Sequence, residues 1–170
     1  MRLIYRAAAL AAAAFSLIAL TACDPQRISE LKEGVSTEAD VRDRLGAPEN
    51  VWEEPGGART FEYNRQPAGQ VNYMITIGPD GRMTALRQVL TPETFARVSP
   101  GRRMDEVRRL LGKPAKVTPY ELKKETWADW RYLEAPNQSK VFTVVYGPDQ
   151  FVLRTQTGVD TDAPEFKGGK

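Results

Sequence analysis

The sequence contains no histidine and only one cysteine, Cys23, among its 170 residues. Without histidine there is no serine–histidine or cysteine–histidine catalytic pair and no histidine-ligated metal site. A single cysteine cannot close an internal disulfide, so the chain must fold on its apolar core alone. We therefore expect no catalytic, cofactor-binding or metal-binding residue, and no cofactor.

An excess of charge of either sign is also missing. Of the 24 basic residues, Arg2 and Arg6 lie in the hydrophobic N-terminal segment, and without them the basic residues equal the 22 acidic ones. A chain of near-zero net charge carries no electrostatic footprint for nucleic acid, so nucleic acid is not an expected partner.

The N-terminal segment has the pattern of a secretion signal. Met1–Arg6 carries two arginines and no acid, and Ala7–Leu20 is apolar except for Ser16. This apolar run is of signal-peptide length and short for a membrane span. We expect residues 1–22 to be a signal peptide.

The end of this segment, Leu20-Thr21-Ala22-Cys23, resembles the lipobox of bacterial lipoproteins. The resemblance implies cleavage before Cys23 and acylation, palmitate included, of the new N-terminal cysteine. More than one acyl chain gives stable anchoring, so the protein would be tethered to a membrane. The alternatives are an ordinary signal peptide followed by a chance cysteine, or an uncleaved anchor.

The remainder of the chain repeats itself. The matched pairs occur in the same order in both halves: Pro25 and Pro92, Ile28 and Phe95, Leu31 and Val98, Gly34 and Gly101, Val41 and Val107, Leu45 and Leu111, Gly46 and Gly112, Pro48 and Pro114, Tyr63 and Tyr132, Gly78 and Gly147. Ordered matches over this length are typical of a duplicated unit. We expect one copy at residues 23–90, a second at 91–158, and a flexible tail at 159–170, where apolar residues are few.

Each copy has the pattern of two short helices followed by strands. A capped proline opens the first helix, Gly34 and Gly101 are expected to end it, and Gly46 and Gly112 to end the second. Alternating apolar residues then predict three strands, with an extra short strand near residues 51–53 and 116–118. The expected fold is α+β: two tandem α-α-β-β-β units, each with two helices packed on an antiparallel sheet.

The repeated pattern resembles the BamE/SmpA/OmlA lipoprotein family. The motif runs Gly34, Val41, Leu45-Gly46 and Pro48, followed by Phe61-x-Tyr63, and it recurs at the paired positions with Trp130-x-Tyr132. The resemblance implies an envelope lipoprotein that helps to assemble or stabilise outer-membrane proteins. Its partners would be the membrane, through acylated Cys23, and envelope proteins, the β-barrel assembly machinery included. The assembly-factor member has one copy of the unit, so its partner-binding residues are not carried over.

A tandem α-α-β-β-β pair also resembles the fold of beta-lactamase inhibitor protein. That protein presents a concave sheet to an enzyme and uses disulfides, which this chain cannot form. The resemblance implies an alternative function, an inhibitor-like module that binds a periplasmic enzyme. A cell-wall-acting envelope enzyme is a second alternative, although the carboxylates show no informative spacing; examples are Glu53, Glu54, Glu62 and Asp129.

Two tryptophans are the candidate partner-binding residues. Trp127 lies on the opposite parity from Trp130 and Tyr132, so it is expected on the outer face of a sheet, where a tryptophan can anchor a partner. Trp52 is the second candidate. The alternative for Trp127 is that a loop or the other copy covers it.

The arginines at 102, 103, 108 and 109 face either lipid phosphates or solvent beside Asp105 and Glu106. The expected location is the outer membrane, facing the periplasm. The inner membrane is the alternative location, because Asp24 follows the cysteine and, by resemblance to enteric lipoproteins, aspartate at that position favours retention there.

Overall fold

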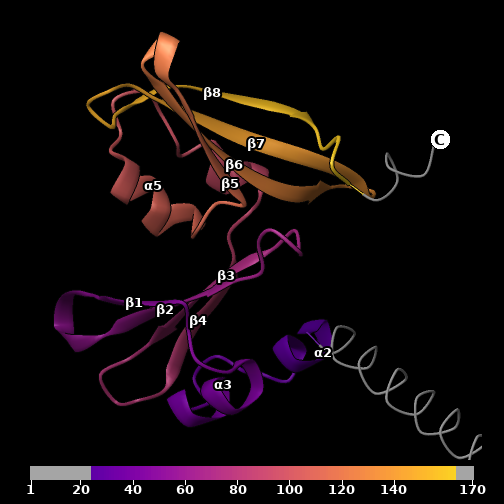
Figure 1. Cartoon of the computed structure of the whole chain (residues 1–170). Helices are drawn as coiled ribbons and strands as arrows, with labels where there is room; N and C mark the ends of the chain where they lie inside the picture. Colours follow the sequence, from indigo (N-terminus) through magenta and orange to yellow (C-terminus); the bar gives the residue numbers. More distant parts are fainter. Residues whose placement is uncertain (1–23, 164–170) are drawn as a thin grey trace, which may run out of the picture.

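The computed structural model describes residues 24–163, so the expected signal peptide (residues 1–22), Cys23 and residues 164–170 lie outside the described part (Figure 1). The described chain forms two successive units of helices and strands. No helix within it is long and apolar enough to span a membrane.

The first unit begins with two helices and continues into a four-stranded antiparallel sheet. The helices are α2 (Asp24–Ser29) and α3 (Glu38–Leu45), and the strands, in spatial order, are β1 (Asn50–Glu53), β2 (Arg59–Asn64), β3 (Asn72–Ile77) and β4 (Met83–Gln88). A short 3-10 turn, η1 (Pro55–Gly57), joins β1 to β2. Each strand pairs with the next along the chain, because the connections are short enough for antiparallel hairpins.

The second unit has the same order of elements. The helices are α4 (Pro92–Phe95) and α5 (Met104–Leu111), and the strands are β5 (Lys116–Tyr120), β6 (Glu125–Glu134), β7 (Gln138–Tyr146) and β8 (Val152–Val159). A 3-10 turn, η2 (Glu121–Lys123), joins β5 to β6. The α+β class is confirmed. Each sheet, however, has four strands rather than three. The additional strands are β1 and β5, which lie where the sequence allowed a short extra strand.

The helix boundaries follow local capping chemistry. The Thr37 side chain and the Asp40 carboxylate form a reciprocal capping box at the start of α3. Gly46 and Gly112 end α3 and α5 at φ 80° and 76°, with ψ near ±180°, a region that essentially only glycine adopts.

The first helix of each unit ends earlier than expected. α2 stops at Ser29 and α4 at Phe95, so Gly34 and Gly101 are not the residues that end them. These glycines lie in the following loops at φ 75° and 85°. The apolar residues Leu31 and Val98 are buried beyond the last helical turn. Burial of these side chains does not require the helix to continue, which is why the apolar spacing extended the expected helices.

Each sheet buries one face against its own helices, which we call the inner face. In the first unit this core contains Leu31, Val41, Phe61, Tyr63, Ile75, Ile77 and Met83. In the second unit it includes Phe95, Val98, Val107, Leu111, Trp130, Tyr132, Phe142 and Val144. Phe95 stacks on Phe142 with ring centroids 4.2 Å apart. The opposite face of each sheet is called the outer face.

The two units stack so that α5 lies between the sheets (Figure 1). Met74 points from the outer face of the first sheet and belongs to the core of the second unit. The layers therefore run α3, first sheet, α5, second sheet. One consequence is that the two outer faces are not equivalent, because the second unit covers only the outer face of the first sheet.

The segment expected to be a flexible tail begins in packed structure. Asp160 is 2% exposed, and its backbone N–H donates to Ser139 O of β7. The Asp160 carboxylate accepts a hydrogen bond from Arg131 at 2.6 Å, and Ala163 is buried. The packed second unit thus extends to the last described residue, Ala163.

Candidate protein-binding surface

The outer face of the first sheet is closed by the second unit. Glu62 has no exposed surface, and its carboxylate accepts the Lys113 N–H at 2.7 Å and faces the Arg108 guanidinium at 3.4 Å. The Asn72 amide donates to the carbonyls of Leu111 and Lys113. These contacts satisfy the C-terminal end of α5, where helices leave backbone carbonyls unpaired. This face is therefore an internal interface.

Trp52 lies at the edge of this internal interface. The Arg109 guanidinium stands 4.9 Å from the centre of its indole ring, a cation–π contact between the units. The indole N–H is buried and has no hydrogen-bond partner among the described residues. Trp52 is therefore half-buried and in contact with the second unit.

The arginines of α5 divide between two environments. Arg103 pairs with Asp105 at 3.1 Å on the exposed side, as expected for a solvated helix face. Arg108 and Arg109 instead face Glu62 and Trp52 of the first unit. Both arginines therefore contact the first unit, because α5 is packed between two sheets, and Arg109 also keeps the exposed surface expected of a solvated helix face.

The outer face of the second sheet has no covering layer in the described part of the chain. Register places Thr118, Trp127, Val145 and Arg154 in one row across the four strands. Val145 is nevertheless fully buried. The Arg154 side chain reaches from β8 across β7, the strand of Val145, to Glu125 on β6.

Glu125, two residues before Trp127 on β6, connects two members of this row, Arg154 and Trp127. Its carboxylate accepts two hydrogen bonds from the Arg154 guanidinium, at 2.7 and 3.0 Å, and one from the Trp127 indole N–H at 2.9 Å. The Arg154 guanidinium also lies 5.8 Å from the centre of the Trp127 ring. A bidentate arginine–carboxylate pair is the most directional ion pair available to side chains. The indole is thereby held in one orientation.

The same contacts determine the ionisation of Glu125. Hydrogen bonds from Arg154 and then Trp127 stabilise the carboxylate and lower the pKa of Glu125 from 4.5 to about 2. The pKa of Arg154 is raised by the same hydrogen bond. The pair therefore remains charged through the acid range in which free carboxylates become protonated.

A second aromatic ring extends the cluster toward the edge of the sheet. The Tyr120 ring lies 4.8 Å from the Trp127 ring, and the Lys123 ammonium is within 6 Å of both ring centres. We call Tyr120, Lys123, Glu125, Trp127 and Arg154 the aromatic–cation cluster. It combines exposed aromatic surface with two cations, of which Arg154 is held by its hydrogen bonds to Glu125.

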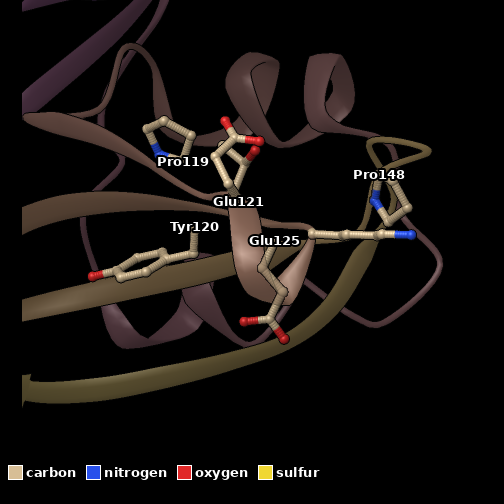
Figure 2. A pocket seen from close by; sticks show the side chains of 7 residues that line it. Pro119, Tyr120, Glu121, Glu125 and Pro148 are labelled. Atoms are coloured by element: carbon tan, nitrogen blue, oxygen red, sulfur yellow. The ribbon is translucent and has the colours of Figure 1, made fainter.

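A shallow pocket of about 260 Å³ adjoins this cluster at the β5–β6 turn (Figure 2). It is lined by Pro119, Tyr120, Glu121, Lys124, Glu125, Thr126 and Pro148. The carboxylates of Glu121 and Glu125 point to opposite sides of the ribbon in Figure 2. These two acids therefore do not face each other across the pocket.

The structure separates the candidate residues of the sequence. Trp127 lies on the open outer face of the second sheet, whereas Trp52 lies beneath Arg109 on the first sheet. Cys23 lies outside the described residues. Within residues 24–163 no three acidic side chains gather in a way that could hold a metal ion.

Sequence reasoning missed the partners of Trp127. Glu125 shares the parity of Trp127 in one strand, so it could have been placed on the same face. Arg154 could not, because its contact depends on the register of two further strands. Tyr120 follows a proline in an edge strand and carries no alternation signal.

Comparison with known proteins adds two similar structures. No protein-family model and no curated protein matches the sequence. A DUF4309 family protein from Bacillus subtilis aligns with 76% of this chain and 82% of its own, at 21% identity and a TM-score of 0.29. A proposed beta-lactamase inhibitor protein from Streptococcus mutans aligns with 82% of this chain and 97% of its own, at 9% identity and a TM-score of 0.35. At these TM-scores neither similarity carries an argument about this chain, and the BamE/SmpA/OmlA resemblance is not confirmed.

Proposed function

We propose that the protein is a non-catalytic adaptor of the cell envelope that binds another protein through the aromatic–cation cluster. Acylation at Cys23 would tether it to the outer membrane, and the bound protein would belong to the outer-membrane assembly machinery. The observation that carries the proposal is the position of Trp127, half-buried and hydrogen-bonded on the one outer face without a covering layer in the described part of the chain.

The composition of the cluster supports protein binding. Tryptophan, tyrosine and arginine are the residues most enriched among those that dominate interface energies. Glu125 holds Arg154 and Trp127 in place before any partner arrives, so less side-chain entropy is lost on binding. A pre-organised aromatic surface of this kind suits a stable docking contact.

The inhibitor-like function is the alternative that the same surface favours. An enzyme in the periplasm would meet Tyr120 and Trp127 on the open sheet, and the membrane anchor would then be incidental. The cell-wall-acting enzyme has less support, because Glu62 and Asn72 close the contact between the units where a cleft would have to lie.

The decisive experiment is in-cell crosslinking from the outer face. A photo-reactive amino acid at Thr118, beside Trp127, is compared with one at Thr84, an exposed position on the first sheet. We expect a crosslinked envelope protein from position 118 only. Trp127→Ala should abolish the product, whereas Leu133→Ala, an exposed apolar side chain farther along β6, should not. Thermal unfolding of both variants checks that they are folded.

Removal of the proposed anchor by Cys23→Ala distinguishes the two candidate functions. Crosslinks to the β-barrel assembly machinery that weaken in Cys23→Ala support the adaptor. A crosslink to one soluble periplasmic enzyme that survives in Cys23→Ala contradicts the adaptor and supports the inhibitor-like function. Equal labelling from positions 118 and 84 would contradict both functions at this surface.

A further inference from the structure

The last strand, β8, is an open edge of the second sheet. It pairs with β7 on one side, and every residue from Leu153 to Val159 is exposed. The Asp160 N–H donates to Ser139 O of β7. Backbone N–H groups point alternately to the two sides of a strand, so those of Arg154, Gln156 and Gly158 also point toward β7. Thr155, Thr157 and Val159 therefore turn their N–H groups toward the open side.

The matching edge in the first unit is closed. Met83 of β4 exchanges hydrogen bonds with the loop through Gly34 and Ser36, and the Glu33 carboxylate accepts the Leu86 N–H at 2.7 Å. Proteins commonly cover edge strands in such ways, because an unpaired edge is a template for another strand.

In the second unit only the start of β8 is covered. Val152 exchanges hydrogen bonds with Gly101 and Arg102, as Met83 does with its own loop. The residue that corresponds to Glu33 is Pro100, which has no side-chain acceptor. Within residues 24–163 nothing replaces the missing carboxylate over Thr155. The first unit thus closes this edge with the Glu33 carboxylate, and the second unit lacks the corresponding contact.

The sequence of the open edge is self-complementary. The segment Leu153-Arg154-Thr155-Gln156-Thr157-Gly158-Val159 is symmetric about Gln156 at its apolar ends and its two threonines, whereas Gly158 lies opposite Arg154. In an antiparallel pair centred on Gln156, each Thr155 would face Thr157 of the other strand, a favourable cross-strand pair. Gly158 leaves room for the opposite Arg154, and no like charges meet.

We propose that β8 pairs antiparallel with β8 of a second copy of this chain about a two-fold axis at Gln156. The two second sheets would join into one continuous sheet through reciprocal N–H···O bonds between Thr155 and Thr157. A two-fold contact of this kind uses the same patch on both copies, which is why a self-complementary strand fits it. The contact lies on the edge of the sheet.

Cysteine crosslinking tests the two-fold position. Gln156→Cys would place two thiols opposite each other in a non-hydrogen-bonded pair, with Cα atoms about 4.5 Å apart, within the disulfide range. Envelopes containing the full chain are oxidised with copper phenanthroline. If the dimer is specific, we expect Gln156→Cys to form a disulfide-linked homodimer at least about tenfold faster than Thr84→Cys, an exposed control on β4.

A charge pair at one position tests the register. A Cβ at Gly158 meets no atom within 4 Å, so side chains are accommodated in the single copy. Gly158→Arg would face Arg154 of the second copy, and Gly158→Glu would face it with the opposite charge. We expect the first variant to weaken dimerisation roughly fivefold in sedimentation of the detergent-solubilised protein, and the second to retain or strengthen it.

Three outcomes would overturn the proposal. These are equal oxidation of Gln156→Cys and Thr84→Cys, equal dimerisation of the two Gly158 variants, and crosslinks from position 156 to a different polypeptide. The last would assign the open edge to strand addition by another protein. Gln156 and Thr84 lie outside the aromatic–cation cluster, so the cysteine test is separate from the test of the proposed function.

Discussion

At the scale of single residues, the ionisation of Glu125 reports the integrity of the aromatic–cation cluster. Its carboxylate is held by Arg154 and Trp127 and has a pKa of about 2, compared with an ordinary value of 4.5. Because the folded-state pKa is depressed, the contribution to stability is complete above pH 4.5. It is lost as the pH falls toward 2.

We therefore predict that Glu125→Gln lowers the melting temperature at neutral pH and that the deficit disappears on acidification. The amide cannot accept a charge-assisted bidentate pair, so Arg154 loses its partner. Thermal unfolding of the two proteins from pH 7 to pH 2 measures the deficit. A deficit that is constant with pH would show that the carboxylate charge plays no part.

Sequence alone indicated Trp127 but not its surroundings. Strand parity placed the indole on the outer face, since side chains alternate along a strand whatever it pairs with. The hydrogen bonds from Arg154 to Glu125 join β8 to β6, and such a contact depends on register that local patterns do not encode. For this reason Arg154 had no signal in the sequence.

At the scale of elements, the paired helix-ending glycines have equal conformations but unequal surroundings. A Cβ added at Gly46 would meet no atom within 4 Å, whereas a Cβ at Gly112 would lie 3.0 Å from the Asn72 amide nitrogen. That amide holds the end of α5 on the first sheet. The same motif therefore has a purely local role in the first unit and an additional interface role in the second.

We predict that Gly112→Ala destabilises the protein more than Gly46→Ala. Both substitutions force alanine into a glycine-only backbone region, at a cost of roughly 1–3 kcal/mol. Gly112→Ala also displaces Asn72 and should cost about 1 kcal/mol more. Urea unfolding of the matched variants gives the difference. Equal losses would indicate that the Asn72 contact does not contribute to stability.

Aromatic side chains support these helix ends in both units. The Tyr63 hydroxyl donates to Gly46 O, and the Trp130 indole N–H donates to Gly112 O, both at 3.0 Å. The sequence showed the glycines and the aromatic pairs as separate repeated features. The structure joins them, because folding brings β2 or β6 beneath the end of the helix in its own unit.

At the scale of the whole molecule, one side chain of the first unit forms with β6 the backbone hydrogen bonds that a neighbouring strand would form. Gln66, in the β2–β3 loop, donates to Arg131 O at 2.8 Å and accepts the Arg131 N–H at 3.1 Å. β5 pairs with β6 only as far as Asp129, so these backbone groups of β6 have no strand partner on that side. The Gln66 amide supplies both missing hydrogen bonds from the other unit.

We predict that Gln66→Ala lowers the free energy of unfolding by roughly 1–3 kcal/mol, since it removes the buried Gln66 side chain and leaves both backbone groups of half-buried Arg131 without that partner. Gln70→Ala, a half-buried glutamine in the same loop, is the matched control and should change little. Chemical denaturation followed by tryptophan fluorescence measures both. A similar loss for Gln66 and Gln70 would contradict a specific role for the amide.

The sequence by itself determined the elements whose causes are local. The capping box at Thr37, the glycines that end α3 and α5, the alternation of the strands and the duplicated order of elements all depend on neighbours within a few residues. Tertiary structure decided which faces remain open. The second unit covers the outer face of the first sheet, and Arg154 secures Trp127 on the other. These contacts join residues far apart in the chain, so their free energies depend on packing that no local pattern contains.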